Sequence, residues 1–189
     1  MGVPHLFEEP VLFIGSLFSD ARVFDEVFPI LKDNFGDILF QSSTHPWEYS
    51  GHYNKELGTP IYRNFVFFER IIDPSTLADI KLFTNGLENT YSKSGKRRIN
   101  LDPGYLTLAK VVLASTKNYS HRIYIGKGIY AELALLHKNQ QFTAMPYTYN
   151  DYKDQTYVTM FLKVRNRLKK KAREKSRLNV TVQPDCPCG

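Results

Sequence analysis

Through roughly its first hundred residues the chain alternates short apolar runs with two longer segments whose apolar residues recur at helical spacing. Runs of four to eight apolar residues are typical of buried strands, and a repeat of three or four is typical of a helix. Capping residues mark the helix boundaries: Ser19 or Asp20 and then Gly36 for the first, and Asp73-Pro74 for the second. The predicted order is a strand over 11–18, a helix over 20–34, strands over 37–42 and 61–72, a helix over 73–91 and a strand over 97–101.

This β-α-β-β-α-β order predicts an α+β fold with a ferredoxin-like core, in which two helices cover one face of a four-stranded sheet. We expect the core to be extended by a further helix over 104–114. Nearly all side chains in that segment are apolar, and Asp102-Pro103 before it is a favourable helix start.

The remaining residues extend the core within the same domain. Segments on either side of the turn Gly126-Lys127-Gly128 predict a β-hairpin over 121–137. An edge strand over 141–145 and a C-terminal helix with an apolar stripe over 157–168 follow. The domain prediction is a single α+β domain over 1–168 and a basic, disordered tail over 169–189 that ends in Cys-Pro-Cys-Gly.

Several classes of protein are disfavoured by composition. No apolar run approaches the roughly 18 residues that span a bilayer, so we expect no membrane partner. Cys186 and Cys188 are the only cysteines and provide no disulfide framework, which fits a cytoplasmic location. They resemble one half of a short zinc-binding module, but two thiols are too few for structural zinc. We therefore predict no metal site, and the sequence indicates no cofactor.

Positive charge is concentrated in two segments of the sequence. Residues 93–127 hold eight Lys and Arg against one acid, and residues 163–177 hold nine against one. The rest of the chain has 8 basic and 17 acidic residues. A basic segment within an acidic body suggests a focused site for an anion. The second run has a simpler interpretation as the solvated end of a helix.

The first candidate site residues lie around the strand predicted over 97–101. Arg97 and Arg98 can each form two parallel hydrogen bonds to a phosphate or carboxylate, and Asn100 can recognise an amide or hydroxyl. Asp102 can orient a catalytic histidine or bind a metal. The alternative is structural, with Arg98 paired to Asp102 or to a distant glutamate.

The second group of candidates surrounds the glycine turn. Lys110 is a lone cation on a predicted apolar helix, where it either reaches water or points into a cleft. His121 can act as a general acid or base, although an isolated histidine beside a strand is more often structural. Arg122, Tyr124 and Lys127 could bind an anion beside the turn amides.

Four motifs together resemble an uncharacterised bacterial family, domain of unknown function 4416. They are VLFIGSLFSD from Val11, KLFTNGLE from Lys81, KRRINLDPGYLTLAKVVLASTKNYSHRIYIGKGIYAEL from Lys96, and PYTYNDY from Pro146. The resemblance covers most of the chain up to about residue 168. It implies membership of the family but no activity. The chain also lacks the phosphate-binding loop of nucleoside triphosphatases.

We therefore expect a protein that binds a small anionic ligand, such as a phosphate-bearing metabolite or a nucleotide. RNA binding through sheet aromatics and the basic tail is one alternative, and a non-catalytic protein-interaction domain is another. Arg98 and Arg122 distinguish these hypotheses: convergence on a pocket favours the ligand, whereas pairing with carboxylates indicates a structural role. No reaction is assigned. The candidates are His121 and Asp102 for catalysis, and Arg97, Arg98, Asn100, Lys110, Arg122, Tyr124 and Lys127 for ligand binding.

Overall fold

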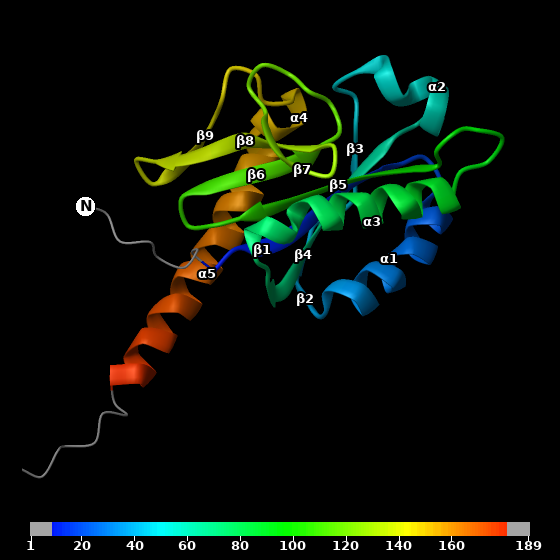
Figure 1. Ribbon diagram of the computed structural model, residues 1–189. Coiled ribbons are helices and arrows are strands. Elements are labelled where there is room, and N and C mark those ends of the chain that lie inside the picture. Colours follow the sequence, from blue (N-terminus) through cyan, green and yellow to red (C-terminus); the bar gives the residue numbers. More distant parts are fainter. Residues whose placement is uncertain (1–8, 181–189) are drawn as a thin grey trace, which may run out of the picture.

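The computed structural model describes residues 9–180, with side chains through Glu174, and its elements follow the predicted order as far as the strand after the second long helix (Figure 1). The elements are β1 (Val11–Phe18), α1 (Ala21–Phe35), β2 (Ile38–Gln41), β3 (His45–Pro46), the 3-10 turn η1 (Gly51–Tyr53), α2 (Asn54–Leu57), β4 (Tyr62–Ile71), the 3-10 turn η2 (Pro74–Thr76), α3 (Leu77–Thr90), β5 (Ile99–Leu106), β6 (Lys110–Ser115), β7 (Ile123–Gly126), β8 (Ile129–Lys138), β9 (Gln141–Ala144), α4 (Asn150–Lys153) and α5 (Gln155–Val180).

All the strands of the described residues belong to one antiparallel sheet. Its main order is β2-β4-β1-β5-β6-β8-β7, with β3 beside β4 and β9 beside β8. β1 is therefore central, between β4 and β5, although these strands are far apart in sequence. The combination of helices with an antiparallel sheet confirms the predicted α+β class. The more specific ferredoxin-like comparison stays a prediction.

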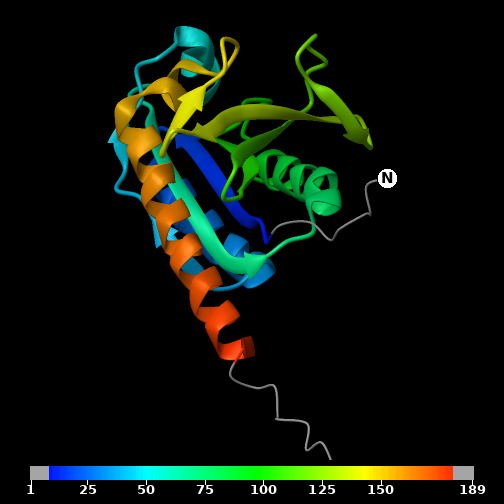
Figure 2. The ribbon, with the colours of Figure 1, turned by 90° about the vertical axis from the view of Figure 1, so that its left-hand side faces the viewer.

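Helices cover both faces of the central strands (Figure 2). Because successive residues of a strand point to opposite faces, β1 contributes to two cores. Phe13 packs with Phe67 of β4 and Phe161 of α5, whose ring centre lies 5.1 Å from that of Phe13. The neighbouring Ile14 packs on the opposite face in the same cluster as Val27 of α1. The C-terminal helix thus closes one core while α1 and α3 close the other.

The sheet aromatics are part of this buried core. Phe65, Phe67 and Phe68 each have no measurable exposure to solvent. An RNA-binding sheet needs aromatic rings that are free to stack on bases. These three residues therefore belong to the core and are not free to stack on bases.

The prediction of a helix over 104–114 is wrong, because this segment forms the β5–β6 hairpin. Gly104 pairs with Leu113, and the Thr107 hydroxyl accepts a hydrogen bond from the Ala109 backbone N–H at 3.1 Å in the turn. A continuous apolar run has no periodicity that separates a buried helix from buried strands. Pro103 is tolerated because this part of β5 pairs only with β1.

Most of the other predicted elements are confirmed. Asp20 caps α1 by accepting a hydrogen bond from the Arg22 N–H, and Gly36 follows the helix with a φ of 92°. β7 and β8 form the predicted hairpin about the turn, where Lys127 adopts a φ of 56° between two glycines. The edge strand is β9. Residues 43–58, for which no element was predicted, contain β3, η1 and α2.

The C-terminal helix combines an apolar stripe with a basic end. Tyr157, Phe161 and Val164 of α5 are buried against the sheet. The helix continues to Val180, so the first part of the predicted basic tail is helical. Its end, with both cysteines, lies outside the described residues. None of the helices in the described part of the chain combines the length and the apolar character needed to cross a bilayer.

Gly104 permits the close approach of β5 and β6, and we predict that Gly104→Ala destabilises the fold. A Cβ atom at this position would lie 2.6 Å from the Phe13 ring and would also contact the Val112 carbonyl oxygen. Overpacking of this kind costs about 1–3 kcal/mol, measurable by urea denaturation. Gly86→Ala is the control, because the α3 position has nothing within 4 Å. This control should gain about 0.5–1 kcal/mol. Equal stability of the two variants would contradict the close approach.

Candidate functional site

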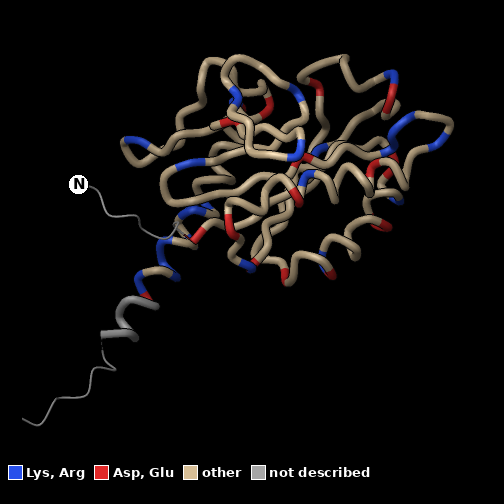
Figure 3. Tube along the Cα trace, in the orientation of Figure 1, with Lys and Arg blue, Asp and Glu red and all other residues tan. Residues whose placement is uncertain are grey.

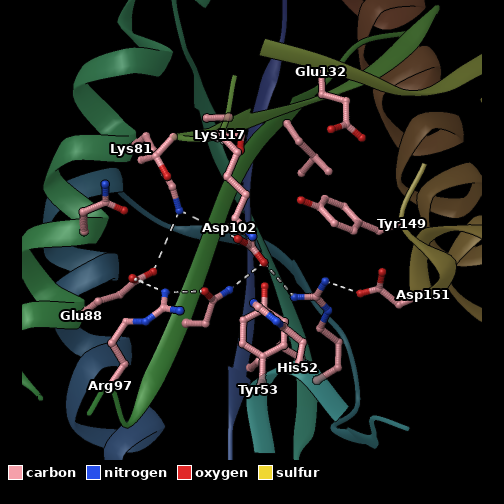
Figure 4. A pocket seen from close by; sticks show the side chains of 18 of the residues that line it. His52, Tyr53, Lys81, Glu88, Arg97, Asp102, Lys117, Glu132, Tyr149 and Asp151 are labelled. Carbon is pink, nitrogen blue, oxygen red and sulfur yellow. Dashed lines mark hydrogen bonds and ion pairs between the residues drawn. The ribbon is translucent and has the colours of Figure 1, made fainter. Parts of the chain in front are cut away.

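A cavity of about 430 Å³ lies where the sheet divides between β5 and β6. The two strands pair only over three residues each, Gly104–Leu106 against Val111–Leu113. Before Gly104, β5 pairs only with β1, and after Leu113, β6 pairs only with β8. Side chains from these two stretches, which do not pair with each other, line the cavity together with residues of α3, α4 and η1. Figure 4 shows α3 on one side and the C-terminal segment on the other.

Arg63 of β4 forms the floor of the cavity. Its side chain is only 3% exposed and donates hydrogen bonds to Asp102 at 3.3 Å and to Asp151 of α4. The guanidinium also lies over the rings of Phe65 and Tyr152, at 4.9 and 5.4 Å. Burial opposes its charge, but the carboxylates outweigh this effect and raise its pKa above the usual value. Arg63 therefore ties together β4, β5 and α4.

Two neighbours make room for Arg63 and orient its partner. Gly15 of β1 lies beneath the guanidinium, and a Cβ atom there would be 3.2 Å from Arg63 Nη1 and from the Tyr152 hydroxyl. The Trp47 indole N–H donates to Asp151 at 3.3 Å. A small residue in the central strand thus lets a cation lie against the sheet.

Lys81 of α3 and Asp102 of β5 both line the cavity, and each has hydrogen-bonding groups that the protein does not use. Lys81 Nζ donates to the Leu101 carbonyl at 2.7 Å, while Asp102 Oδ1 and Glu88 lie 3.8 and 4.0 Å away. An ammonium has three N–H donors, so two of them lack a close acceptor. Asp102 Oδ2 accepts from Arg63 and Asn100, but Oδ1 accepts no hydrogen bond within the described structure. Both groups are available to a ligand.

Arg97 uses four of its five N–H donors on protein groups. It donates to both oxygens of Glu56 at 2.6 and 2.8 Å, to Glu88 at 2.9 Å and to Asn100 Oδ1 at 2.8 Å. The pKa of the Glu88 carboxyl is raised by burial, against the effect of the neighbouring cations. Arg97 therefore holds α2, α3 and β5 together at the edge of the cavity.

Glu132 of β8 stands on the opposite wall and is 1% exposed. Its carboxylate accepts from the Arg122 guanidinium at 2.7 Å and lies 3.3 Å from His121 Nε2. Arg122 also donates to the Tyr149 hydroxyl at 2.8 Å. The His121 ring stacks on Tyr147 with ring centres 4.1 Å apart. His121 thus contacts Glu132, and the predicted pairing with Asp102 is not formed.

Several further polar side chains line the cavity without hydrogen bonds or ion pairs to the described protein, and three of them bear on ligand binding. Lys117 lies on the segment between β6 and β7 and points toward the middle of the cavity in Figure 4. Asn85 of α3 and the Tyr53 hydroxyl are the others. Burial, with a contribution from Asp102, raises the pKa of Tyr53, so its hydroxyl stays a donor at neutral pH.

The structure brings three of the sequence-predicted residues together. Arg97, Asn100 and Asp102 all line the cavity. Asn100 donates to Asp102 at 2.8 Å and accepts from Arg97, so it links the two charged groups. Arg122 lies behind this surface, bound to Glu132. Asn100 and Asp102 share a face of β5, as the predicted strand requires, whereas Arg97 precedes β5 and reaches them from outside the strand.

The other predicted ligand-binding residues lie elsewhere. Arg98 pairs with Asp20 at 2.9 Å, and Lys127 pairs with Asp79. Lys110 is exposed at the far end of β6, beside the β5–β6 turn, and Tyr124 is 59% exposed on β7. None of these side chains lines the cavity.

The basic segment of the sequence does not form a basic surface in the fold. Figure 3 shows acidic and basic residues interspersed over the body, with Lys and Arg gathered on the projecting part of α5. Arg98 and Arg122, whose convergence would have supported an anion site, each face a carboxylate. The lining of the cavity is balanced, with Arg63, Lys81, Arg97 and Lys117 against Glu88, Asp102, Glu132 and Asp151.

Sequence reasoning missed Arg63, Lys81, Glu132 and Asp151 as site residues. The available signal was a charged residue inside an apolar element, as at Arg63 in the strand YRNFVFF. Charges of this kind are seldom fully buried unless they are paired. In the part of the chain that the structure describes, no group of three or more His, Cys, Asp or Glu side chains could hold a metal ion.

Residues 8–168 match the family model described as domain of unknown function (DUF4416). The chain belongs to this family. The match confirms the resemblance seen in the four motifs, and it includes every residue of the cavity lining. Comparisons with curated proteins and with solved structures gave no match. The functional argument for this DUF4416 member therefore rests on its own geometry.

We predict that Arg63→Ala lowers the free energy of unfolding by about 3–5 kcal/mol, because it leaves Asp102 and Asp151 without their buried partner. Arg98→Ala is the matched control. That side chain is 39% exposed in its ion pair with Asp20, so its loss should cost no more than about 1 kcal/mol. Chemical denaturation measures both variants. Similar losses would show that Arg63 does not anchor the fold.

The Glu56–Arg97 pair predicts a pH-dependent contribution to stability. Hydrogen bonds from Arg97 lower the pKa of Glu56 in the folded state. The pair therefore stabilises fully above the unfolded pKa, near 4.5, and the contribution is lost as pH falls through the lowered folded pKa. Glu56→Gln should cost roughly 0.5–1 kcal/mol at pH 7 and progressively less below pH 4.5.

Thermal unfolding of Glu56→Gln and the wild type across this pH range tests the prediction. Glu48→Gln provides the control, because Glu48 is exposed and forms no ion pair with the described residues. A Glu56→Gln deficit that stays constant down to the lowest pH would contradict the assigned interaction.

Proposed function

We propose that the protein binds a small polar ligand with an acidic group, phosphate or carboxylate, in the cavity between β5 and β6. The carrying observation is that buried Lys81 and exposed Lys117 both line this cavity with N–H donors that no described residue accepts. A buried ammonium with unmet donors is costly unless a ligand or water satisfies them. An anionic oxygen between the two amines would do so, in charge-assisted hydrogen bonds.

The rest of the cavity suits a small organic molecule. Its volume of about 430 Å³ lies in the usual range for small-ligand sites. Trp47, Tyr53 and Tyr149 contribute aromatic surface, with the rings of Trp47 and Tyr53 5.5 Å apart. These rings could contact the body of a sugar or base, while Asn85 supplies a free amide. A phosphate-bearing metabolite or a nucleotide fits this combination.

The proposal moves the recognition of the anion to different residues. Lys81 and Lys117 take the role that the sequence suggested for Arg98 and Arg122, which are held by carboxylates. Arg97 contributes as a scaffold, since four of its five donors are already used. Binding in this cavity is a separate proposal from RNA binding, for which the buried sheet aromatics offer no support.

A thermal-shift screen tests the proposal with inorganic phosphate, pyrophosphate, sugar phosphates, mononucleotides and short RNAs. A ligand at about 100 times its Kd adds about 2.7 kcal/mol to stability, a clear rise in Tm. We expect Lys117→Ala and Lys81→Gln each to weaken binding of the responding anion by roughly tenfold or more, because each removes a charged donor.

Lys110→Ala is the matched control, since Lys110 is an exposed lysine outside the cavity. It should bind like the wild type. The cavity proposal is wrong if no small anion raises Tm, if only RNA does so, or if Lys110→Ala weakens binding as much as Lys117→Ala.

A further inference from the structure

One wall of the cavity holds a buried acceptor that the fold leaves unsatisfied. Glu132 Oε1 has no hydrogen-bond donor among the described residues, although the residue is 1% exposed. The other carboxylate oxygen is occupied by Arg122 and His121. Figure 4 shows the carboxylate directed into the cavity, facing Tyr149.

A buried carboxylate oxygen without a donor is unfavourable, because it has lost its hydration and gained nothing in return. The neighbouring donors are already committed. His121 lies against Oε2, and Arg122 donates to Oε2, the Ser115 hydroxyl, the Lys117 carbonyl and the Tyr149 hydroxyl. Free Oε1 is therefore an acceptor that a bound molecule can use.

The charge balance of the cavity also favours a ligand that carries hydrogen-bond donors. Its lining has as many carboxylates as cations, so a plain anion gains little from the net charge. Asp102 Oδ1 is a second carboxylate oxygen without a hydrogen bond from the described residues. A molecule that carries both an acidic group and N–H donors satisfies both kinds of group.

We infer that the ligand bears a nitrogen hydrogen-bond donor, an amine or amino group, that binds Glu132 Oε1 while its acidic group is held by Lys81 and Lys117. This inference rests on the proposed function and specifies the substrate class of the same cavity. Amino-substituted nucleotides and amino sugar phosphates share this chemistry. A ligand with an oxygen acceptor in place of the amine would face Glu132 with two acceptors opposed.

Matched ligand pairs test the inference on the intact protein by calorimetry. CMP presents an amino donor at C4 and an acceptor at N3, whereas UMP presents an oxygen acceptor at C4 and an N–H donor at N3. Glucosamine 6-phosphate and glucose 6-phosphate form the corresponding sugar pair. We expect the amino member of the responding pair to bind roughly 10- to 100-fold more tightly, the effect of one hydrogen bond to a charged acceptor. The two pairs also distinguish the two sources of the amine.

Glu132→Gln adds a second readout with a distinctive sign. The amide oxygen can accept from Arg122 in place of Oε2, which turns the amide N–H₂ toward the cavity. The acceptor then becomes a donor, so preference should shift from CMP toward UMP. The wild-type comparison needs no variant, so it decides the inference even if Glu132→Gln folds poorly.

The outcomes separate the two proposals. Binding of both members of each pair with equal affinity, abolished by Lys117→Ala, would uphold the anion site and overturn the role of Glu132. Tighter binding of UMP than CMP by the wild type would overturn it as well. Absence of binding by every anion, including inorganic phosphate, would overturn the proposed function itself.

Discussion

The structure depends most on the buried guanidinium of Arg63. It joins Asp102 of β5 to Asp151 of α4 across the central strand β1, where Gly15 leaves the necessary space. The mutual attraction of buried ions offsets their loss of hydration only when the geometry and the remaining hydrogen bonds are good. Here Arg63 and Asn100 link Asp151 and Asp102 to Arg97 in one chain of contacts, while the buried Nε of Arg63 has no acceptor among the described residues. The same chain forms the floor of the cavity. Fold and candidate site therefore share the same set of charges.

The linear distribution of charge gave a misleading picture of that site. Basic residues cluster between 93 and 127 in the sequence, but the fold pairs four of them with acids from elsewhere in the chain. The pairs are Arg97 with Glu56, Arg98 with Asp20, Arg122 with Glu132 and Lys127 with Asp79. An acidic remainder and a basic segment can neutralise one another once they pack together. Pairing across distant elements is not contained in a count along the chain.

Local signals predicted local structure well. The cap at Asp20 and the glycine turn around Lys127 carry their own backbone preferences, and both appear as expected. The segment after Asp102 lacked such a signal, because strands covered on both faces are mostly apolar and do not alternate with polar residues. Three site residues, Arg97, Asn100 and Asp102, were still found, since they lie close together on one segment. Arg63, Lys81 and Glu132 come from three separate elements that only the tertiary fold assembles.

The position of α4 and α5 has a consequence for the biosynthesis of the protein. Asp151 completes the ion pair of Arg63, and Phe161 covers Phe13 and the other aromatic side chains on one face of the sheet. Both residues follow every strand of the sheet in the sequence, so they leave the ribosome after the residues that they contact. A chain interrupted before α4 would leave Arg63 with Asp102 but without Asp151, and would expose aromatic residues, the kind of surface that chaperones and proteases act on. Burial of Arg63 and of these aromatic side chains therefore depends on synthesis of α4 and α5.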